Sequence, residues 1–215
     1  MGPRSEFTAA PWRVSHSPWG DAVVVSEHFS PERPVYSVGH SRGGITAMSV
    51  AAGHPHPVSR LVLVKASPEG PTADAIERAG HWFESSPRPM RSAEEAAEFF
   101  GTAPAPARLA GMERREDGWW PRFDDDITLA TWEGPRGGWR GDWVAGRCPA
   151  PLVRGEEDWI ADDDVSCMEI SGHQLSGLTG PGAGHDVHLD APHPLVGVLG
   201  DFLQRAGAPP LTAKR

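Results

Sequence analysis

The stretch that most constrains this chain runs from Pro34 to His54, with the sequence PVYSVGHSRGGITAMSVAAGH. It begins with a short apolar run, Val35 to Val38, continues with a glycine-rich turn, and ends in a segment of small residues. This order predicts a buried strand, a tight turn and a helix. A serine on a sharp turn between a strand and a helix presents its hydroxyl for reaction. Ser41 is therefore the candidate nucleophile.

The glycines around Ser41 have a steric explanation. A strained turn brings neighbouring backbone segments too close together for a Cβ atom. Gly44, the first residue after the turn, is expected to let the predicted helix pack tightly on the strand. The spacing G-x-S-x-G is a weak signal in a chain with 25 glycines, so its flanking strand and helix carry the interpretation. The alternative is an ordinary glycine turn that leads into a helix.

The length and charge of the chain limit what it can bind. A chain of 215 residues is long enough for one domain with a full core. The net charge of −9 and the pI of about 5.5 disfavour binding to nucleic acid or to an anionic membrane, because both need clustered Lys and Arg. We therefore expect a small neutral molecule as the partner, with no nucleic acid and no membrane.

The cysteines and the first residues of the chain indicate its cellular compartment. Cys148 and Cys167 offer neither a disulfide framework nor a C-x-x-C site, and we expect both to be buried free thiols in a reducing cytosol. The first residues, MGPRSEFTAAPWRV, lack the apolar region of a signal peptide, and no stretch has the length of a membrane-spanning helix. These features predict a cytoplasmic protein.

Along the chain, apolar runs alternate with helical patterns. The run from Arg60 to Val64 (RLVLV) is continuously apolar after its first residue, which predicts a strand buried on both faces of a parallel sheet. Pro151 to Gly155 and, more weakly, Gln174 to Leu178 predict further strands. Ser17 to Phe29 and Pro194 to Gln204 predict helices. The alternation favours an α/β fold with a mostly parallel sheet flanked by helices.

A long insertion, residues 67–147, separates the two groups of predicted strands. We expect it to contain no strands. Ala73 to Phe83 and Ser92 to Gly101 predict helices, the second with Ser92 and Glu95 in capping-box spacing. Six of the nine tryptophans fall in it, which predicts either an apolar core of the insertion or the wall of a binding pocket. These are Trp82, Trp119, Trp120, Trp132, Trp139 and Trp143.

A serine hydroxyl needs a histidine base, and that base needs a carboxylate that orients it. The segment GHSRGG at Ser41 resembles the elbow of the α/β-hydrolase family, commonly G-H-S-x-G-G. The segment GPGAGHDVHLDAP is similar to the family's closing loop, so the resemblance implies His185 as the base. The segment PLVRGEEDW is similar to the family's acid strand, which implies Asp158 as the carboxylate. The resemblance also implies the backbone N–H of Arg42 as one oxyanion donor.

The identity of the acid stays open at this point. Glu156 and Glu157 are close to Asp158 in the sequence, and Glu69 follows the RLVLV strand, where some members of the family carry the acid. All four carboxylates have the alternative of lying in a solvated loop. The run from Asp162 to Asp164 predicts a helix N-terminus rather than a cation site.

The closing loop also permits a metal site. His185, His188, Asp190 and His193 are ligand types, but prolines on both sides of His193 make their convergence awkward. We therefore predict no metal and no cofactor. His188 is expected to have a structural role within the loop.

The resemblance implies an architecture and an activity. Residues 1–66 and 148–215 would form the hydrolase core, and residues 67–147 a cap over the site. Glu113 to Thr128 is similar to cap segments of the esterase and carbon–carbon hydrolase branch. The implied activity is a serine hydrolase that acts on an ester-like carbonyl of a small apolar substrate through a Ser-His-Asp triad and an acyl-enzyme. A serine nucleophile argues against haloalkane dehalogenase and epoxide hydrolase chemistry.

The family carries several strands before the elbow strand, whereas the residues before Val35 predict one helix and no strand. We therefore expect a truncated form of the fold, without the His-Gly motif that supplies the second oxyanion donor. The strand before Ser41 would then have an apolar free edge, which folded proteins avoid. Either the true start lies upstream or a second copy covers the edge in a homodimer. The alternative function is an inactive fragment or an interaction module.

Overall fold

The computed structural model describes most of the chain after residue 34. The described residues are 35–53, 58–100, 109, 111–132, 138–146, 148–156, 160, 162–170, 178–180 and 182–204. The helix expected over Ser17 to Phe29 lies outside them, as do residues 174–177 of the weakest expected strand.

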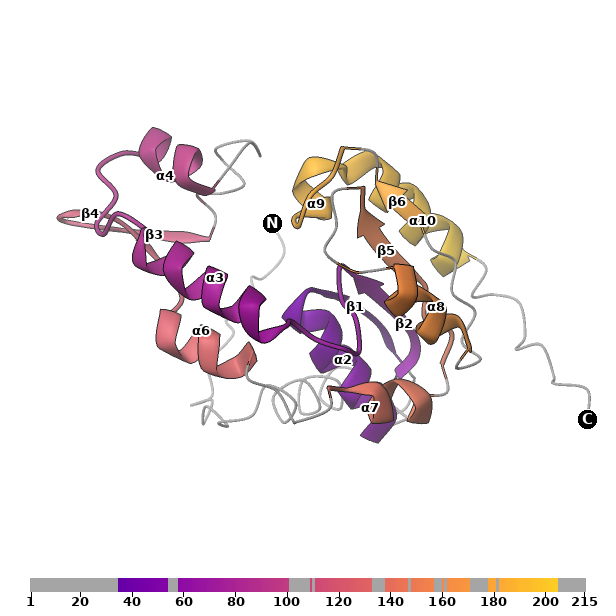
Figure 1. Ribbon diagram of the computed structural model, residues 1–215. Helices are drawn as coiled ribbons and strands as arrows, with labels where there is room; N and C mark the ends of the chain where they lie inside the picture. Colours follow the sequence, from indigo (N-terminus) through magenta and orange to yellow (C-terminus); the bar gives the residue numbers. More distant parts are fainter. Residues whose placement is uncertain are drawn as a thin grey trace, which may run out of the picture.

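Among the described residues, the centre of the fold is a parallel sheet of four strands in the order β1-β2-β5-β6 (Figure 1). These are β1 (Val35–His40), β2 (Val58–Val64), β5 (Leu152–Gly155) and β6 (Leu178–Gly180). The expected α/β class with a mostly parallel sheet is confirmed. The long apolar run of β2 is explained by its central place, because strands buried on both faces need apolar side chains on both.

Helices cover both faces of this sheet. Alternate residues of β2 pack on opposite sides: Leu61 and Leu63 join one apolar cluster, whereas Val62 and Val64 join the other. The first cluster includes α2 (Arg42–Gly53), α7 (Arg140–Ala145) and α8 (Asp162–Ile170). The second includes α9 (Val187–Asp190) and α10 (Pro192–Gln204).

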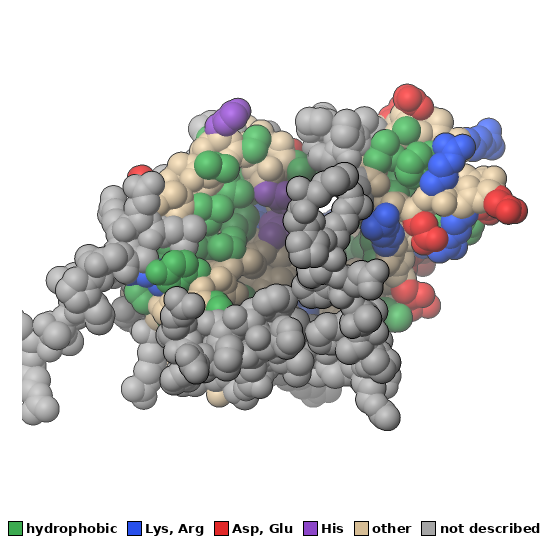
Figure 2. All heavy atoms as spheres, turned by 180° about the vertical axis from the view of Figure 1, so that it is seen from behind, with side chains coloured by type: hydrophobic (Ala, Val, Ile, Leu, Met, Phe, Trp, Pro, Cys, Tyr) green, Lys and Arg blue, Asp and Glu red, His purple; other side chains and the backbone are tan. Residues whose placement is uncertain are grey.

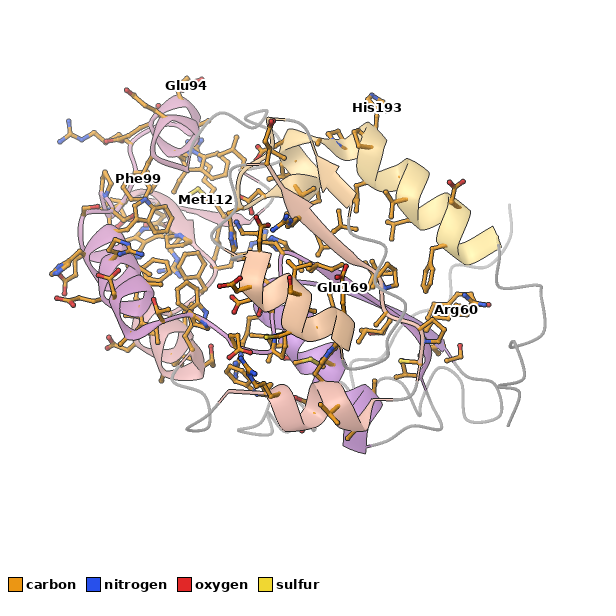
Figure 3. The ribbon with its side chains drawn as sticks, turned by 45° about the vertical axis from the view of Figure 1, so that its right-hand side comes forward. Arg60, Glu94, Phe99, Met112, Glu169 and His193 are labelled. Carbon is orange, nitrogen blue, oxygen red and sulfur yellow. The ribbon has the colours of Figure 1, made fainter. Side chains whose placement is uncertain are left out.

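The insertion forms a separate group of elements beside the sheet, at the left of Figure 1. It contains α3 (Ala73–Glu84), α4 (Ala93–Phe100), β3 (Met112–Arg115), β4 (Gly118–Pro121) and α6 (Asp125–Trp132). Met90, Ala96 and Met112 form a small core of its own, against which Phe99 packs (Figure 3). Seen from behind, charged side chains gather over this part of the molecule (Figure 2).

The expectation that the insertion contains no strands is wrong. β3 and β4 form an antiparallel hairpin, with Arg115 opposite Gly118 and Met112 opposite Pro121. Each strand has only four residues, and three of the four in β3 are charged and exposed, so little apolar alternation was visible. The Asp-Gly pair at 117–118 is a hairpin signal that could have revealed it.

Helix ends follow their sequence signals. The Thr72 hydroxyl accepts a hydrogen bond from the Ala75 N–H at 3.2 Å at the start of α3. The Ser92 hydroxyl accepts one from the Glu95 N–H at 3.2 Å, which confirms the expected cap of α4. Asp162 to Asp164 form the first turn of α8, where the helix dipole favours negative charge.

The tryptophans of the insertion divide between two cores. Trp82 stacks on Phe99 within the group of elements beside the sheet. Trp139 and Trp143, by contrast, are buried in the main core, and the Trp143 indole N–H donates to the Met168 carbonyl at 3.2 Å. Helix α7 is therefore packed on the sheet layer, although its sequence falls in the insertion.

Both cysteines are free, but only Cys148 is partly buried, and burial raises the pKa of its thiol. The expectation that Cys167 is buried is wrong, because it lies on the exposed side of the short helix α8. Within the described residues, no helix has both the length and the apolar character needed to cross a membrane.

Strand β1 stands at one end of the described sheet and pairs there with β2. Its Tyr36 and Val38 side chains are each 49 % exposed. The homodimer expected through this edge stays a prediction.

Candidate active site

The turn between β1 and α2 has the strained geometry expected of a nucleophile elbow. Ser41 has a φ of 51°, in the left-handed region that residues with a side chain avoid. Its N–H donates to the Val64 carbonyl at 2.8 Å, and its carbonyl accepts from the Gly44 N–H at 2.9 Å. These bonds fix the serine at the junction of the first two strands and the first helix of the described fold.

Two of the glycines around Ser41 are required by close packing. A Cβ atom on Gly39 would lie 2.4 Å from the Gly43 carbonyl oxygen. A Cβ on Gly44 would lie 2.5 Å from the Cβ of Ala66, which follows β2. Gly43, although part of the G-x-S-x-G spacing, has no atom within 4 Å of its Cβ position. The steric expectation therefore holds for Gly39 and Gly44 but not for Gly43.

This difference gives a matched pair of variants. We expect Gly39→Ala to lower the free energy of unfolding by about 3 kcal/mol, because backbone atoms must move to admit the methyl group. Gly43 lies in the first turn of α2, with open space at its Cβ position. Gly43→Ala should therefore leave the free energy of unfolding unchanged or raise it by about 0.5 kcal/mol. Urea denaturation of both variants measures the difference. Equal stabilities would contradict the close approach at Gly39.

A cavity of about 240 Å³ opens beside the elbow, and both Ser41 and His185 line it. The structure therefore brings the predicted nucleophile and the predicted base to one cavity. Most of the wall is apolar and comes from α2, the segment after β2, α3 and α6. Its apolar members are Ile45, Ala66, Pro71, Ala75, Ala79 and Trp132.

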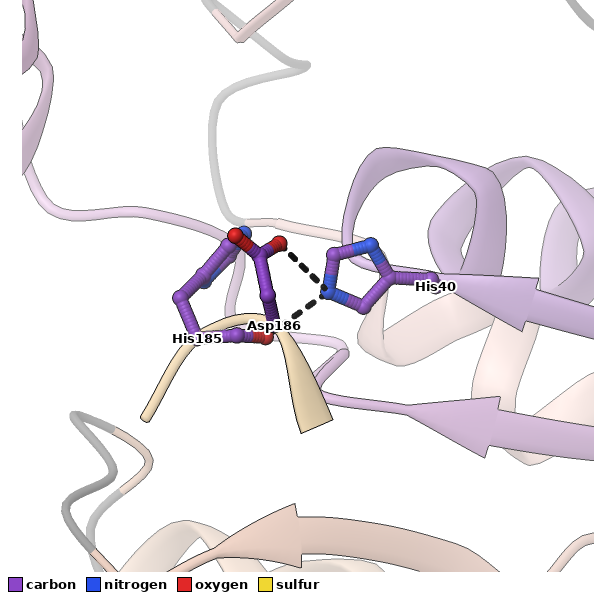
Figure 4. A group of neighbouring side chains, drawn as sticks. All are labelled: His40, His185 and Asp186. Atoms are coloured by element: carbon purple, nitrogen blue, oxygen red, sulfur yellow. Dashed lines mark hydrogen bonds and ion pairs between the residues drawn. The ribbon is translucent and has the colours of Figure 1, made fainter. Parts of the chain in front are cut away.

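The loop of His185 is tied to the elbow by His40, the residue before Ser41. The His40 Nε2–H donates to the His185 carbonyl oxygen at 2.8 Å (Figure 4). The His40 ring also lies 4.9 Å from the His185 ring and 4.8 Å from the His188 ring, between centroids. The Asp186 carboxylate is 4.0 Å from His40 Nε2. Sequence reasoning missed His40, whose only signal was its place next to Ser41.

Of the four candidates for the acid, the structure describes Glu156 and Glu69. Asp158 and Glu157 lie outside the described residues. The exposed carboxylate of Glu156 accepts a hydrogen bond from the Gly182 N–H at 2.8 Å, at the start of the His185 loop. The Glu69 carboxylate is 2.5 Å from Arg140 Nε. Both described alternatives are thus engaged in structural contacts.

The residues that the sequence suggested as metal ligands do not form one group. The Asp190 carboxylate accepts from the Gly184 N–H at 3.1 Å, and His193 points away from the sheet on α10 (Figure 3). Among the described residues, the ligand atoms of His40, His185 and Asp186 lie within 4.8 Å of one another. Only His185 belongs both to this cluster and to the ligands that the sequence suggested.

Arg42 contributes a backbone and a side chain to the site. Its N–H belongs to the first turn of α2, where backbone donors have no partner within the helix and the dipole favours negative charge. Its guanidinium lies 5.0 Å above the Trp139 ring, and burial lowers the pKa of Arg42. The second oxyanion donor of the family, whose His-Gly motif the sequence lacks, would belong before β1, and the residues there lie outside the described ones.

A family model described as the alpha/beta hydrolase fold matches residues 21–192. The chain belongs to the α/β-hydrolase family. The elbow, the parallel sheet and the closing loop after β6 are the features through which the hydrolase fold was expected, and this expectation is confirmed. None of the curated proteins compared with this chain matched its sequence.

Solved structures show the same fold. The chain is similar to E-2-(acetamidomethylene)succinate hydrolase, with 17 % identity and a TM-score of 0.77 over 88 % of this chain and 75 % of the other. It is similar to a marine microorganism esterase, with 21 % identity and a TM-score of 0.65 over 88 % and 77 %. It is also similar to an esterase from Mycobacterium tuberculosis, with 23 % identity and a TM-score of 0.62 over 88 % and 68 %.

Proposed function

We propose that the protein is a serine hydrolase that cleaves an ester-like carbonyl compound through a Ser-His-Asp triad. The observation that carries the proposal is the strained Ser41, which shares a cavity with His185. Strain of this kind persists at functional sites, where the surrounding structure compensates its cost. The similarity to proteins named as a hydrolase and as esterases agrees with this reaction class.

The roles follow from the chemistry of acyl transfer. His185 removes the proton from the Ser41 hydroxyl, and the oxygen attacks the substrate carbonyl. The Arg42 N–H donates to the oxyanion that develops, and Asp158 holds the imidazole in the required tautomer. His185 then protonates the leaving group, and water hydrolyses the acyl-enzyme. The apolar lining suits an apolar part of the acyl or leaving group.

A cap over the nucleophile is part of the proposal. We propose residues 1–66 and 148–215 as the hydrolase core and residues 67–147 as the cap. Ala75 and Ala79 of α3 and Trp132 of α6 line the cavity, which agrees with a cap over the nucleophile. Since α7 packs on the sheet layer, the part that reaches the cavity ends at Trp132 among the described residues.

The direct test is covalent labelling. Purified protein is treated with a fluorophosphonate, which reacts with activated serines, and the modified peptide is identified by mass spectrometry. The expected product is a single adduct on Ser41. Ser67 is the internal control, because this residue lines the same cavity but its hydroxyl accepts a hydrogen bond from the Glu69 N–H. Labelling of both serines, or of neither in folded protein, would contradict the proposal.

The second candidate is an interaction module without catalysis. The half-exposed Tyr36 and Val38 on the edge strand favour it, since such edges pair with other chains. A folded protein that takes no label and hydrolyses no ester, but forms a dimer in sedimentation, would support this function instead.

The contact between His40 and the His185 loop leads to a prediction about kcat. We expect His40→Ala to lower kcat by about 10- to 100-fold with little change in KM, because a base displaced by a fraction of an ångström loses its alignment with the nucleophile. His40→Asn, which keeps a donor, should recover part of the loss. Steady-state kinetics with an aryl ester measures both. His193→Ala, an exposed histidine on α10, is the control; an equal effect there would contradict a positioning role for His40.

A further inference from the structure

A stripe of three residues along α3 consists of Ala75, Ala79 and Phe83. Residues four positions apart lie on the same side of a helix. The two alanines line the cavity beside Ser41, whereas Phe83 is not part of its wall and is buried, with 7 % of its surface exposed. The stripe therefore changes from small to large side chains where it leaves the cavity.

Trp132, the last residue of α6, is the largest side chain among the described residues that line the cavity. Its ring lies 6.3 Å from the Phe83 ring, between centroids, and the two planes are tilted by 52°. Phe83 also packs on Phe123, at 5.5 Å between centroids. Tilted aromatic pairs at such distances attract one another. Trp132 therefore contacts the cavity and also packs on a buried aromatic ring, which restricts its movement.

A second contact joins α3 to α6, which lie side by side (Figure 1). A Cβ atom on Gly80 would lie 3.7 Å from Leu129 Cδ1, so the two helices pack closely at this glycine. Gly80 directly follows Ala79, and Leu129 precedes Trp132 by one turn of α6. The indole and the two alanines thus belong to one packed unit of the insertion.

The opposite side of the cavity belongs to the main core and has little freedom to change. Ile45 of α2 and Ala66 after β2 line it, and they are only 5 % and 2 % exposed. Ala66 also lies against Gly44, where a Cβ would be 2.5 Å away, so a larger residue at position 66 would disturb the elbow. The size of the cavity can therefore vary on the side of α3 and α6 without a change to the nucleophile.

We propose that Trp132, Ala75 and Ala79 determine the length of the acyl group that the enzyme accepts. The alanines leave room for an acyl chain beside α3, and the indole limits how far it extends. This inference rests on the proposed function and deepens it. The acyl group is the part bonded to Ser41 in the acyl-enzyme, and Ser41 lines this cavity.

The volume of the cavity favours a short acyl chain. It is about 240 Å³, below the range of about 300–1,000 Å³ that is typical of pockets for drug-sized ligands. Its described wall has an apolar majority, so methylene groups are suited to it. The substrate class that fits is an ester of a short, apolar carboxylic acid.

The kinetic test uses 4-nitrophenyl butanoate, hexanoate and octanoate. We expect kcat/KM of the wild-type enzyme for butanoate to exceed that for octanoate by about tenfold or more, because a chain that does not fit loses its contacts in the transition state. Trp132→Ala should raise the octanoate/butanoate ratio by about tenfold or more, and Trp132→Phe should raise it less. Ala79→Leu should lower the hexanoate/butanoate ratio by about tenfold, because it fills the space beside α3.

The matched control is Trp120→Ala. Trp120 lies on β4, is not among the residues that line this cavity, and donates through its indole N–H to Asp117 at 2.9 Å. Its loss removes an indole from the same insertion, so the octanoate/butanoate ratio should stay within about twofold of the wild-type value. A shift as large as that of Trp132→Ala would contradict a specific role of Trp132.

A second series, butyl, hexyl and octyl acetate, lengthens the alcohol instead of the acyl group. Trp132→Ala should leave the ratios of kcat/KM within this series unchanged. A shift confined to the alcohol series would overturn the assignment of the cavity to the acyl group. Circular dichroism of each variant confirms that it is folded.

Binding without catalysis separates this inference from the proposed function. Methyl hexanoate and methyl octanoate are titrated calorimetrically into Ser41→Ala and into Ser41→Ala combined with Trp132→Ala. Tighter octanoate binding only in the combined variant supports the role of Trp132, even if the wild-type protein hydrolyses no ester and the proposed function fails. A wild-type enzyme that hydrolyses the aryl esters with a chain-length profile unchanged by Trp132→Ala overturns the inference and leaves the hydrolase intact.

Discussion

Ser41→Ala is expected to lower kcat for aryl esters by about 10⁶-fold, which is the loss found when the nucleophile of a serine triad is removed. The reason is that no other described hydroxyl lies on the strained turn between β1 and α2. Ester hydrolysis by the purified variant, corrected for the uncatalysed rate, measures the effect. The fluorophosphonate adduct should disappear at the same time.

The control for this variant is Ser67→Ala. Ser67 is buried and lines the same cavity as Ser41, so Ser67→Ala also removes one hydroxyl oxygen from a residue of the cavity wall. We expect a change in kcat/KM of less than about tenfold, since Ser67 has no role in the bond-forming step. A loss that is as large for Ser67 as for Ser41 would show that activity depends on the shape of the cavity rather than on a nucleophile.

Ser41→Gly separates the chemical role from the strain. Glycine adopts a positive φ without steric cost, so this variant should be as inactive as Ser41→Ala but more stable, by about 0.5 to 1 kcal/mol in the free energy of unfolding. Urea denaturation of the two variants gives the difference. A Ser41→Gly variant no more stable than Ser41→Ala would contradict strain at the elbow.

Asp158→Asn is expected to lower kcat by about 10⁴-fold. An asparagine in place of the orienting carboxylate favours the wrong tautomer of the histidine and does not stabilise the imidazolium. KM should change little, because an orienting carboxylate acts through the histidine rather than on the substrate. Steady-state kinetics with the aryl ester measures both constants.

The other carboxylates supply the controls. Glu156 and Glu69 have structural partners, the Gly182 N–H and Arg140, so Glu156→Gln and Glu69→Gln should keep kcat within about tenfold of wild type. Glu157→Gln completes the set of alternatives from the sequence. If one of these three variants loses activity to the extent expected for Asp158→Asn, the acid is that residue and the assignment of Asp158 is wrong.

The fold class could be predicted because it depends on local patterns. The apolar run of β2 indicates a strand buried on both faces, and Pro34 to His54 contains the signals for a strand, a sharp turn and a helix. The β3–β4 hairpin has no apolar run of this kind, and its local signal is the Asp-Gly pair at 117–118. Its strands are short, and the residues that define its buried side are few, so tertiary contacts such as the bridge from Met90 to Trp119 stabilise it.

The sequence by itself determined the residue types that chemistry needs: a serine between glycines after a strand, and a histidine in a glycine-rich loop near the end of the chain. Only the tertiary structure decided which residues share a cavity, because side chains 144 positions apart, such as Ser41 and His185, are brought together by the packing of β1 and the loop after β6. It also revealed His40 as the link to the His185 loop and Lys65 as a buried residue of the cavity wall. The Pro34 to His54 stretch specifies the elbow locally, whereas the charge and shape of the cavity depend on residues from β2, α3, α6 and the closing loop.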